Sequence, residues 1–292
     1  MKKIKLFLFI FMLITSRNQL FAQPEPDSTL IRIETRDGNE FTGRIIRQDA
    51  DKVVLFTENL GEISILTKDI VSQKEIPSEL VKDGKIWFPN PQATRYFWSP
   101  NGYGLRKGEG YYQNIWVLWN QVAYGITDNF SIGATVIPLF LFDGSPTPVF
   151  INPKLSIPVI KNKFNIGAGA LAGTILGESD ATFGIVYGVS TFGKPDNNVS
   201  IGLGYAFAAG GWASTPLINF SGMFRLSSRW YFLTENYYFG LGDGEGGIIN
   251  GGARWIIKKA ALDFGLFLPV GADAGLIAIP WLGFTVPFGN TD

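Results

Sequence analysis

Five charged residues lie inside apolar, glycine-rich stretches in the second half of this 292-residue chain: Lys154, Arg225, Glu235, Arg254 and Asp263. Charges of both signs in an enclosed space can pair with one another and fill the space. They can also form a constriction that selects small solutes by charge. The sequence leaves both possibilities open, and it predicts that Asn152, Asn219 and Asn250 line the same interior.

The chain contains no histidine and no cysteine. Without histidine there is no Ser-His or Asp-His catalysis, no histidine-based zinc site and no general base of the commonest kind. Without cysteine there are no disulfides, no thiol chemistry and no lipid attachment through an N-terminal cysteine. We therefore predict that the protein is not an enzyme and has no catalytic, cofactor-binding or metal-ligating residues.

Two glycine-containing stretches could be mistaken for binding motifs. The acidic run Gly242 to Gly247 could hold Ca²⁺ through carboxylate and carbonyl oxygens, but it has few side-chain ligands, so we predict a solvated loop. Runs such as Gly202-Leu203-Gly204 lack the strand-to-helix context of a phosphate-binding loop. They are instead predicted to be small residues that face an interior.

The N-terminus has the features of a secretory signal. Three lysines precede an apolar run from Leu6 to Ile14, which is followed by Leu20-Phe21-Ala22. We predict cleavage after Ala22. Removal of four of the 25 basic residues leaves 21 against 25 acidic ones, a net charge of −4. A weakly acidic chain is poorly suited to bind nucleic acid, so none is expected.

Composition divides the mature chain into two blocks. Residues 85–292 hold 31 of the 35 glycines and all eight tryptophans, whereas the preceding block is richer in charge. Proline-containing segments mark the boundary. We predict a signal peptide at 1–22, a small β module at 23–76, a linker at 77–93 and a larger β domain at 94–292.

The first block is predicted to contain five short strands. They cover residues 30–35, 40–48, 52–58, 62–66 and 71–76, with a hairpin at Asp37-Gly38 and a helical turn at Lys68-Asp69-Ile70 before the fifth strand. With Phe41-Thr42-Gly43 and Gly61-Glu62-Ile63, this order resembles SH3-like and Sm-like small barrels. The resemblance implies a five-stranded small barrel, and we expect it to be a periplasmic adaptor or plug-like module with no chemistry of its own.

The second block alternates with period two over segments of about 10–13 residues. In one segment Ile201, Leu203 and Tyr205 oppose Gly202 and Gly204. The opposing face carries Gly, Ala, Ser and Asn rather than the Lys and Glu of a solvated sheet. Aromatic residues gather near segment ends, as in an interfacial girdle. A soluble β-sandwich is the alternative, but length and composition favour strands that span a membrane.

The connections between these segments alternate in charge. One set is basic: Lys161 and Lys163, Lys194, Arg229, and Lys258 with Lys259. The interleaved set is acidic: Asp143, Glu178 with Asp180, Asp243 with Glu245, and Asp273. This is the pattern of an up-and-down antiparallel barrel whose two ends face different environments.

Placing the tight Thr127-Asp128-Asn129 turn on the periplasmic side gives twelve strands. The first is Thr94 to Tyr103, with Arg106 to Gly110 as an outer loop, and Tyr111 to Ile126 returns as one strand. Arg225, Arg254 and Asp263 then face inward at mid-segment; the strand of Glu235 has aromatic residues on both faces. Charge on the lipid face would cost about 2–4 kcal/mol for Arg or Lys at mid-depth.

This block resembles small outer-membrane β-barrel proteins in its pattern, in the stretch Tyr124 to Gly133 and in the aromatic Phe288 near the C-terminus. The resemblance implies localisation in an outer membrane, in contact with lipid and with the N-terminal module in the periplasm. Our first hypothesis is a non-enzymatic protein that anchors a periplasmic partner through residues 23–84. The alternatives are a narrow channel for small hydrophilic solutes and, disfavoured by the missing histidine, a lipid-modifying enzyme.

Overall fold

The computed structural model describes residues 29–83, 85–138, 147–178, 181–241, 244–271 and 277–290. The signal segment 1–22 lies outside these residues, as do Asp143, Asp180, Asp243 and Asp273 of the acidic connections. The chain divides into two compact units, Met1–Lys85 and Ile86–Asp292. In the described ranges, no helix is long and apolar enough to cross a membrane.

The first unit is a five-stranded antiparallel sheet in the order β4-β3-β2-β1-β5. Its elements are β1 (Ile31–Thr35), β2 (Glu40–Gln48), β3 (Lys52–Thr57), β4 (Gly61–Leu66), the 3-10 turn η1 (Thr67–Asp69) and β5 (Ile70–Glu75). Strand alternation buries one face, and its core consists of Ile31, Ile33, Val53, Leu55 and Ile65. The five strands and the turn match the sequence prediction to within one or two residues.

The closed small barrel is not confirmed. Within the described part of the chain, β4 pairs only with β3 and β5 pairs only with β1, so the sheet keeps two edges. The short elements η2 (Ser78–Leu80), β6 (Val81–Lys82) and β7 (Lys85–Ile86) follow.

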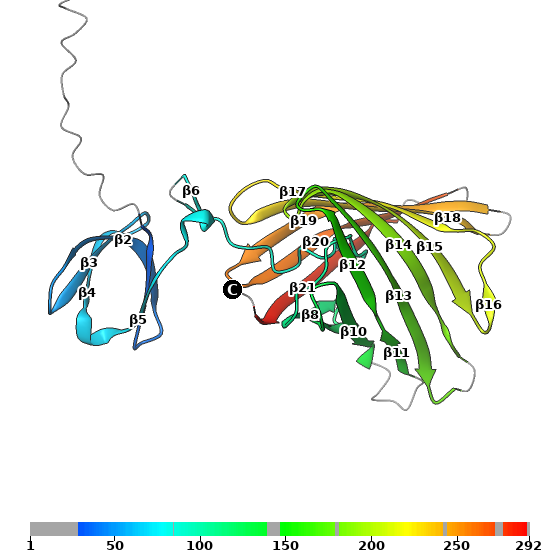
Figure 1. The fold of residues 1–292 in the computed structure, drawn as a ribbon, viewed down its shortest axis with the longest axis horizontal. Coiled ribbons are helices and arrows are strands. Elements are labelled where there is room, and N and C mark those ends of the chain that lie inside the picture. The colour runs from blue at the N-terminus through cyan, green and yellow to red at the C-terminus, as the bar shows by residue number, and fades with distance from the viewer. Residues whose placement is uncertain are drawn as a thin grey trace, which may run out of the picture. The chain divides into compact units, whose positions relative to one another are not determined.

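The second unit is a closed antiparallel barrel with twelve wall strands. They are β8 (Glu109–Ile115), β9 (Trp119–Gly125), β10 (Phe130–Val136), β11 (Thr147–Ile151) continued by β12 (Lys154–Ile160), β13 (Phe164–Leu176), β14 (Phe183–Lys194), β15 (Asn197–Ala208), β17 (Leu217–Arg225), β18 (Trp230–Leu241), β19 (Gly244–Ile257), β20 (Ala260–Gly271) and β21 (Ile279–Gly289). The short β16 (Gly211–Trp212) pairs with β15. The ring closes because β8 pairs with both β21 and β9 (Figure 1).

The barrel wall is apolar outside and polar inside. Along β15, Val199, Ile201 and Leu203 are 44–50% exposed, while Asn198 and Ser200 are buried. The same contrast recurs around the ring, where the buried inner positions include Gln113, Gln121, Ser131, Asn165, Thr191, Asn219, Ser221 and Asn250. A chain that turns apolar side chains outward and polar ones inward is arranged for lipid outside the wall.

The predicted count of twelve strands is confirmed, but two of its members were wrong. Thr94 to Tyr103 is not a wall strand; Tyr96 and Phe97 within it are completely buried. Tyr111 to Ile126 is not one strand but the hairpin β8–β9. The two errors cancel in the count.

The β8–β9 turn carries no glycine, proline or asparagine at its centre. Trp116 and Val117 adopt left-handed backbone conformations, with φ of 51° and 66°, which is where Asn-Gly is normally found. Asn114 accepts a hydrogen bond from the Val117 amide, and Asn120 donates to the carbonyl oxygens of Val117 and Leu118. These flanking asparagines supply the turn chemistry, so the apolar sequence itself did not reveal the turn.

The loop Arg106 to Gly110 was also placed at the wrong end. The Lys107 amide donates to Asp128 at 3.0 Å, and the Gly108 amide donates to the Gly125 carbonyl at 3.0 Å. This loop therefore lies beside the tight Thr127-Asp128-Asn129 turn. Arg106 and Lys107 consequently join the basic connections at the short-turn end of the barrel.

The sequence places Phe183, Ile185, Tyr187 and Val189 on the outward apolar face of β14, opposite Gly184, Gly188 and Ser190, but the structure turns this face toward the lumen. Val189 and Thr191 are buried, whereas Val186 and Phe192 are 45% and 50% exposed. Val189 lies opposite Gly167 and Gly202 on the two neighbouring strands, and Tyr187 lies opposite Gly169 and Gly204. These glycines leave room for the larger β14 side chains.

Candidate functional site

The chain that precedes the first wall strand runs inside the barrel and occupies part of the lumen. We call residues 87–105 the luminal segment; Figure 1 shows the chain between β7 and β8 running among the barrel strands. Tyr96 and Phe97 in this segment belong to a buried cluster with Ile115, Met223, Tyr231, Leu233, Ile256, Ala261, Phe267 and Trp281 from the wall. The segment folds back on itself, because the Tyr96 amide donates to the Ser99 carbonyl and the Asn101 amide to the Thr94 carbonyl.

Arg254 and Asp263 hold one side of this segment. Arg254 Nε and Nη2 donate to the two carboxylate oxygens of Asp263 at 2.7 and 2.8 Å, and both residues are buried. The other N–H groups of Arg254 donate to the Gln92 and Tyr96 carbonyl oxygens at 2.7 Å and to Asn90 Oδ1 at 3.2 Å. All five guanidinium N–H donors are therefore used, which offsets the cost of burying the ion pair.

Glu235 holds the tip of the segment. Its Oε2 accepts hydrogen bonds from three consecutive backbone amides, Phe97, Trp98 and Ser99, at 2.8, 3.0 and 3.0 Å. The hydroxyl of Tyr237 donates to Oε1. Successive N–H groups that converge on one oxygen form an anion-binding nest, here occupied by a carboxylate from the wall.

Lys154 extends from β12 to the opposite side of the segment. Its Nζ donates to the Thr94 carbonyl at 3.1 Å and to the Tyr103 carbonyl. Because both acceptors are neutral carbonyl groups, the charge of Lys154 is hydrogen-bonded but has no carboxylate within ion-pair distance in the described residues.

Arg225 does not join the other four residues. It lies at the end of β17, where Nη1 forms an ion pair with Asp196 at 2.7 Å and Nη2 donates to the Phe88 and Ser228 carbonyl oxygens. Its guanidinium also stacks on Trp87 and Tyr231, with 4.6 and 5.1 Å to the ring centroids. Arg225 therefore fixes the start of the luminal segment at the short-turn end, rather than at mid-barrel as the sequence predicted.

Arg95 is the functional candidate that sequence reasoning missed. It is 9% exposed, and its Nη1 donates to Gln113 Oε1 at 3.2 Å and Gln121 Oε1 at 2.8 Å. The signal was present, because Arg95 is the only charged residue between Lys85 and Arg106, in a stretch rich in aromatic and apolar residues. It was overlooked because the stretch was interpreted as a wall strand.

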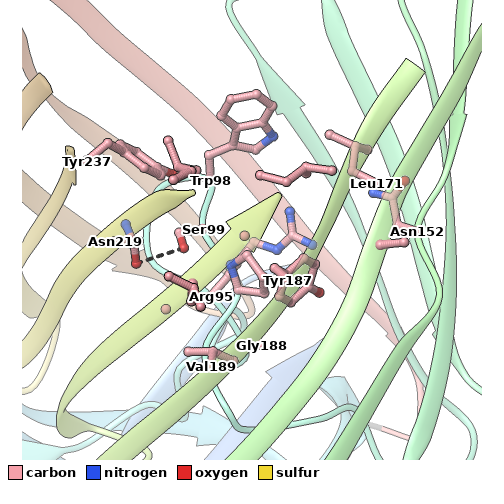
Figure 2. A pocket seen from close by; sticks show the side chains of 17 residues that line it. Arg95, Trp98, Ser99, Asn152, Leu171, Tyr187, Gly188, Val189, Asn219 and Tyr237 are labelled. Carbon is pink, nitrogen blue, oxygen red and sulfur yellow. Dashed lines mark hydrogen bonds between the residues drawn. The ribbon is translucent and has the colours of Figure 1, made fainter. Parts of the chain in front are cut away.

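A cavity of about 160 Å³ lies between the tip of the segment and the wall. Figure 2 shows Arg95 from the luminal segment and Tyr187 from β14 within this space, with Ser99 donating to Asn219 at 3.1 Å on one side. Trp98 and Pro100 of the luminal segment also line it, and the wall contributes Asn152, Leu171, Ile185, Val189, Leu217 and Tyr237. The wall residues Leu171, Ile185 and Leu217 lie in the strand halves away from the short-turn end, so the cavity lies on the side of the tip that faces away from the short turns.

Comparisons with known proteins give similarity in fold only. No family model matches the chain, and no curated protein matches it. Among solved structures, the chain is similar to the KdgM porin in complex with disordered oligogalacturonate (TM-score 0.40, 9% identity, 62% of this chain and 95% of that one). It is also similar to a loop-deletion mutant of OmpT, an outer membrane protein of Vibrio cholerae (0.36, 10%, 89% and 96%), and to the CymD monoaromatic hydrocarbon channel (0.34, 8%, 89% and 86%).

Fold and site together define a class of protein: a closed, twelve-stranded, up-and-down barrel with an apolar outer surface, whose lumen contains the luminal segment that precedes the first wall strand. Similarities at these scores do not extend that description to an activity.

Proposed function

We propose that this protein is a closed outer-membrane barrel that anchors its N-terminal module on the periplasmic side and has no enzymatic activity of its own. The observation that supports this most directly is the network of contacts on the luminal segment. Arg254, Glu235, Lys154 and Arg225 come from four different wall strands, and each binds backbone groups of the segment. The segment connects the module to β8 along the chain. A pull on the module would therefore be resisted by the hydrogen bonds between the wall and the luminal segment.

The direction of the chain supports a periplasmic module. Phe88, near the start of the luminal segment, is held by Arg225 and lies under the guanidinium of Arg229, at the same end as the short connections. Short connections are typical of the periplasmic side of outer-membrane barrels. The module preceding this point would then be in the periplasm, where its two sheet edges could pair with a strand of a protein partner. The SH3-like or Sm-like character of the module is part of this proposal.

The buried carboxylates are poorly placed for catalysis. Both oxygens of Asp263 bind Arg254, and both oxygens of Glu235 accept hydrogen bonds from amides or from Tyr237. A carboxylate occupied in this way lacks a free oxygen for a substrate proton. This supports an anchoring role rather than a lipid-modifying enzyme.

A channel for small hydrophilic solutes is the second candidate, and the cavity above the luminal tip favours it, because the lumen is not completely filled. Twelve strands lie between the small filled barrels and the 16–18-stranded porins that leave a water channel. A channel would require the luminal segment to move away from its wall contacts.

Planar-bilayer recording separates the two candidates. The mature chain, refolded and inserted, should be electrically silent, and a variant that lacks residues 23–105 should conduct because the segment is gone. Steady conductance by the intact chain would support the channel and contradict a closed barrel.

Anchoring needs a separate measurement in cells. A protease site placed between residues 77 and 84 should release the module into the soluble periplasmic fraction only after cleavage. A module that stays with the membrane after cleavage, or that is accessible to protease added outside intact cells, would contradict the proposed anchoring and orientation.

A further inference from the structure

Arg95 carries a buried positive charge with incomplete hydrogen bonding. Its Nε–H is buried and has no partner in the described part of the chain, and Nη1 is shared between two neutral glutamine oxygens. A buried arginine is ordinarily paired with a carboxylate, because an unpaired charge away from water is costly. Arg95 therefore has unused capacity to bind an anion.

The surroundings of Arg95 are positive overall. Among the described residues, the buried charges of the lumen are three cations, Arg95, Lys154 and Arg254, and two anions, Glu235 and Asp263. Asp263 pairs with Arg254, and Glu235 is held by backbone amides, so neither carboxylate is within ion-pair distance of Arg95 in the described residues. One negative charge would balance this group.

The cavity beside Arg95 combines a few polar groups with apolar walls. Asn152 lines it with a buried Oδ1 that has no partner in the described structure. Most of the remaining wall is Leu171, Ile185, Val189, Leu217 and the ring of Trp98. A small inorganic ion would leave these apolar surfaces uncovered, whereas a molecule with an apolar body would cover them.

We propose that this cavity binds a small carboxylate with an apolar body, with Arg95 binding the carboxylate group. Its size is appropriate, since the cavity has about 160 Å³ and an apolar cavity of roughly 150 Å³ in another protein accommodates benzene. The site lies on the side of the luminal tip away from the short turns. With the short turns in the periplasm, as proposed above, the ligand would enter from the extracellular end of the barrel.

Sodium benzoate is a suitable probe, and benzyl alcohol is its neutral counterpart of similar shape. Titration calorimetry of the mature chain in lipid nanodiscs, with empty nanodiscs as the blank, should show saturable binding of one benzoate per chain. Benzyl alcohol should bind with an affinity at least about tenfold lower than that of benzoate, because it lacks the charge-assisted contact. Equal binding of the two probes, or no saturable benzoate binding, would overturn the proposal.

Two variants test the site itself. Arg95→Gln removes the charge and should reduce benzoate affinity by about tenfold or more. Gly202→Val puts a side chain into the cavity without changing Arg95; a Cβ at Gly202 meets its nearest atom, Asn219 Cβ, at an ordinary 3.5 Å. It should abolish benzoate binding even if Arg95→Gln fails to fold.

Gly251→Val is the matched control, because Gly251 pairs with the exposed Leu266 on another wall strand and has open space around its Cβ position. It should bind benzoate like the wild type. Binding that survives Gly202→Val would mean that the probe binds elsewhere, and binding that survives Arg95→Gln would remove Arg95 from the site; either result contradicts the proposal. The benzoate measurements are independent of the planar-bilayer and protease-cleavage experiments, so the binding site and the anchoring role can fail separately.

Discussion

Arg254 on β19 and Asp263 on β20 are cross-strand partners, and their side chains meet in two hydrogen bonds of 2.7 and 2.8 Å that face the lumen. The remaining donors of Arg254 reach the luminal segment, including the Gln92 and Tyr96 carbonyl oxygens. One ion pair thus joins two wall strands to a segment about 160 residues earlier in the chain. It holds the luminal segment against this part of the wall.

Replacement of Asp263 by asparagine should strongly destabilise the barrel. The substitution keeps the shape but leaves Arg254 charged and buried, a situation that costs about 3–5 kcal/mol. Denaturant unfolding of the refolded protein in detergent would measure the loss. The double variant Asp263→Asn with Arg254→Met should be more stable than Asp263→Asn alone. If Asp263→Asn were as stable as the wild type, the pair would not hold the segment.

Glu235→Gln should loosen the tip of the luminal segment without opening the wall. The amide oxygen can accept from fewer of the three backbone N–H groups and carries no charge, and a hydrogen bond to a charged group contributes about 1.5–3 kcal/mol. Hydrogen exchange followed by mass spectrometry should show faster exchange in the peptide that contains Phe97, Trp98 and Ser99. Glu178→Gln, at an exposed position after β13, is the control and should leave that peptide unchanged.

Val117→Gly should stabilise the β8–β9 hairpin. Val117 is 71% exposed and has a φ of 66°, a conformation that costs a non-glycine residue about 1–2 kcal/mol. Glycine adopts it without that cost. Unfolding in detergent should give a gain of about 1 kcal/mol, whereas Val122→Gly, on the outer face of β9, should reduce stability. A loss of stability in Val117→Gly would show that the valine side chain contributes more than the strain costs.

The pKa of Asp37 in the first unit should lie below its ordinary value of 3.8. The Thr35 hydroxyl donates to its carboxylate, with further hydrogen bonds from Asn39. Because the folded pKa is lowered, ionised Asp37 favours the fold above the unfolded pKa, and this contribution is lost as pH falls through the folded value. Carboxyl NMR titration should show the lowered pKa, and Thr35→Val should raise it toward 3.8. An unchanged pKa in Thr35→Val would exclude the hydroxyl as the cause.

Local patterns predicted the parts of the fold that depend on local geometry. Alternation along β15 distinguished its outward face from its inward face, and the Asp37-Gly38 turn located the first hairpin. Alternation predicted the wrong outward face for β14, because Tyr187 and Val189 of its more apolar face point into the lumen. The glycines of β13 and β15 decided the outward face, and they become neighbours of β14 only when the strands pair.

For the candidate site, the sequence predicted that Arg254 and Asp263 face inward and that Lys154 does so with them. It did not predict what they bind. Arg254 and Gln92 are 162 positions apart, Glu235 and Phe97 138, and Lys154 and Tyr103 51. No periodicity connects such distant positions, and Tyr96 and Phe97 have the composition of a wall strand.

The sequence by itself determined the class of architecture. Strands that alternate apolar with small or polar residues can satisfy their backbone hydrogen bonds in lipid only by closing into a barrel. Only the tertiary structure decided that the segment before the first strand lies in the lumen, that the inner charges hold it in place and that Arg95 is left beside a cavity. The physical reason is that these outcomes depend on hydrogen bonds and packing between residues far apart in the chain, which form only once the ring of strands encloses them.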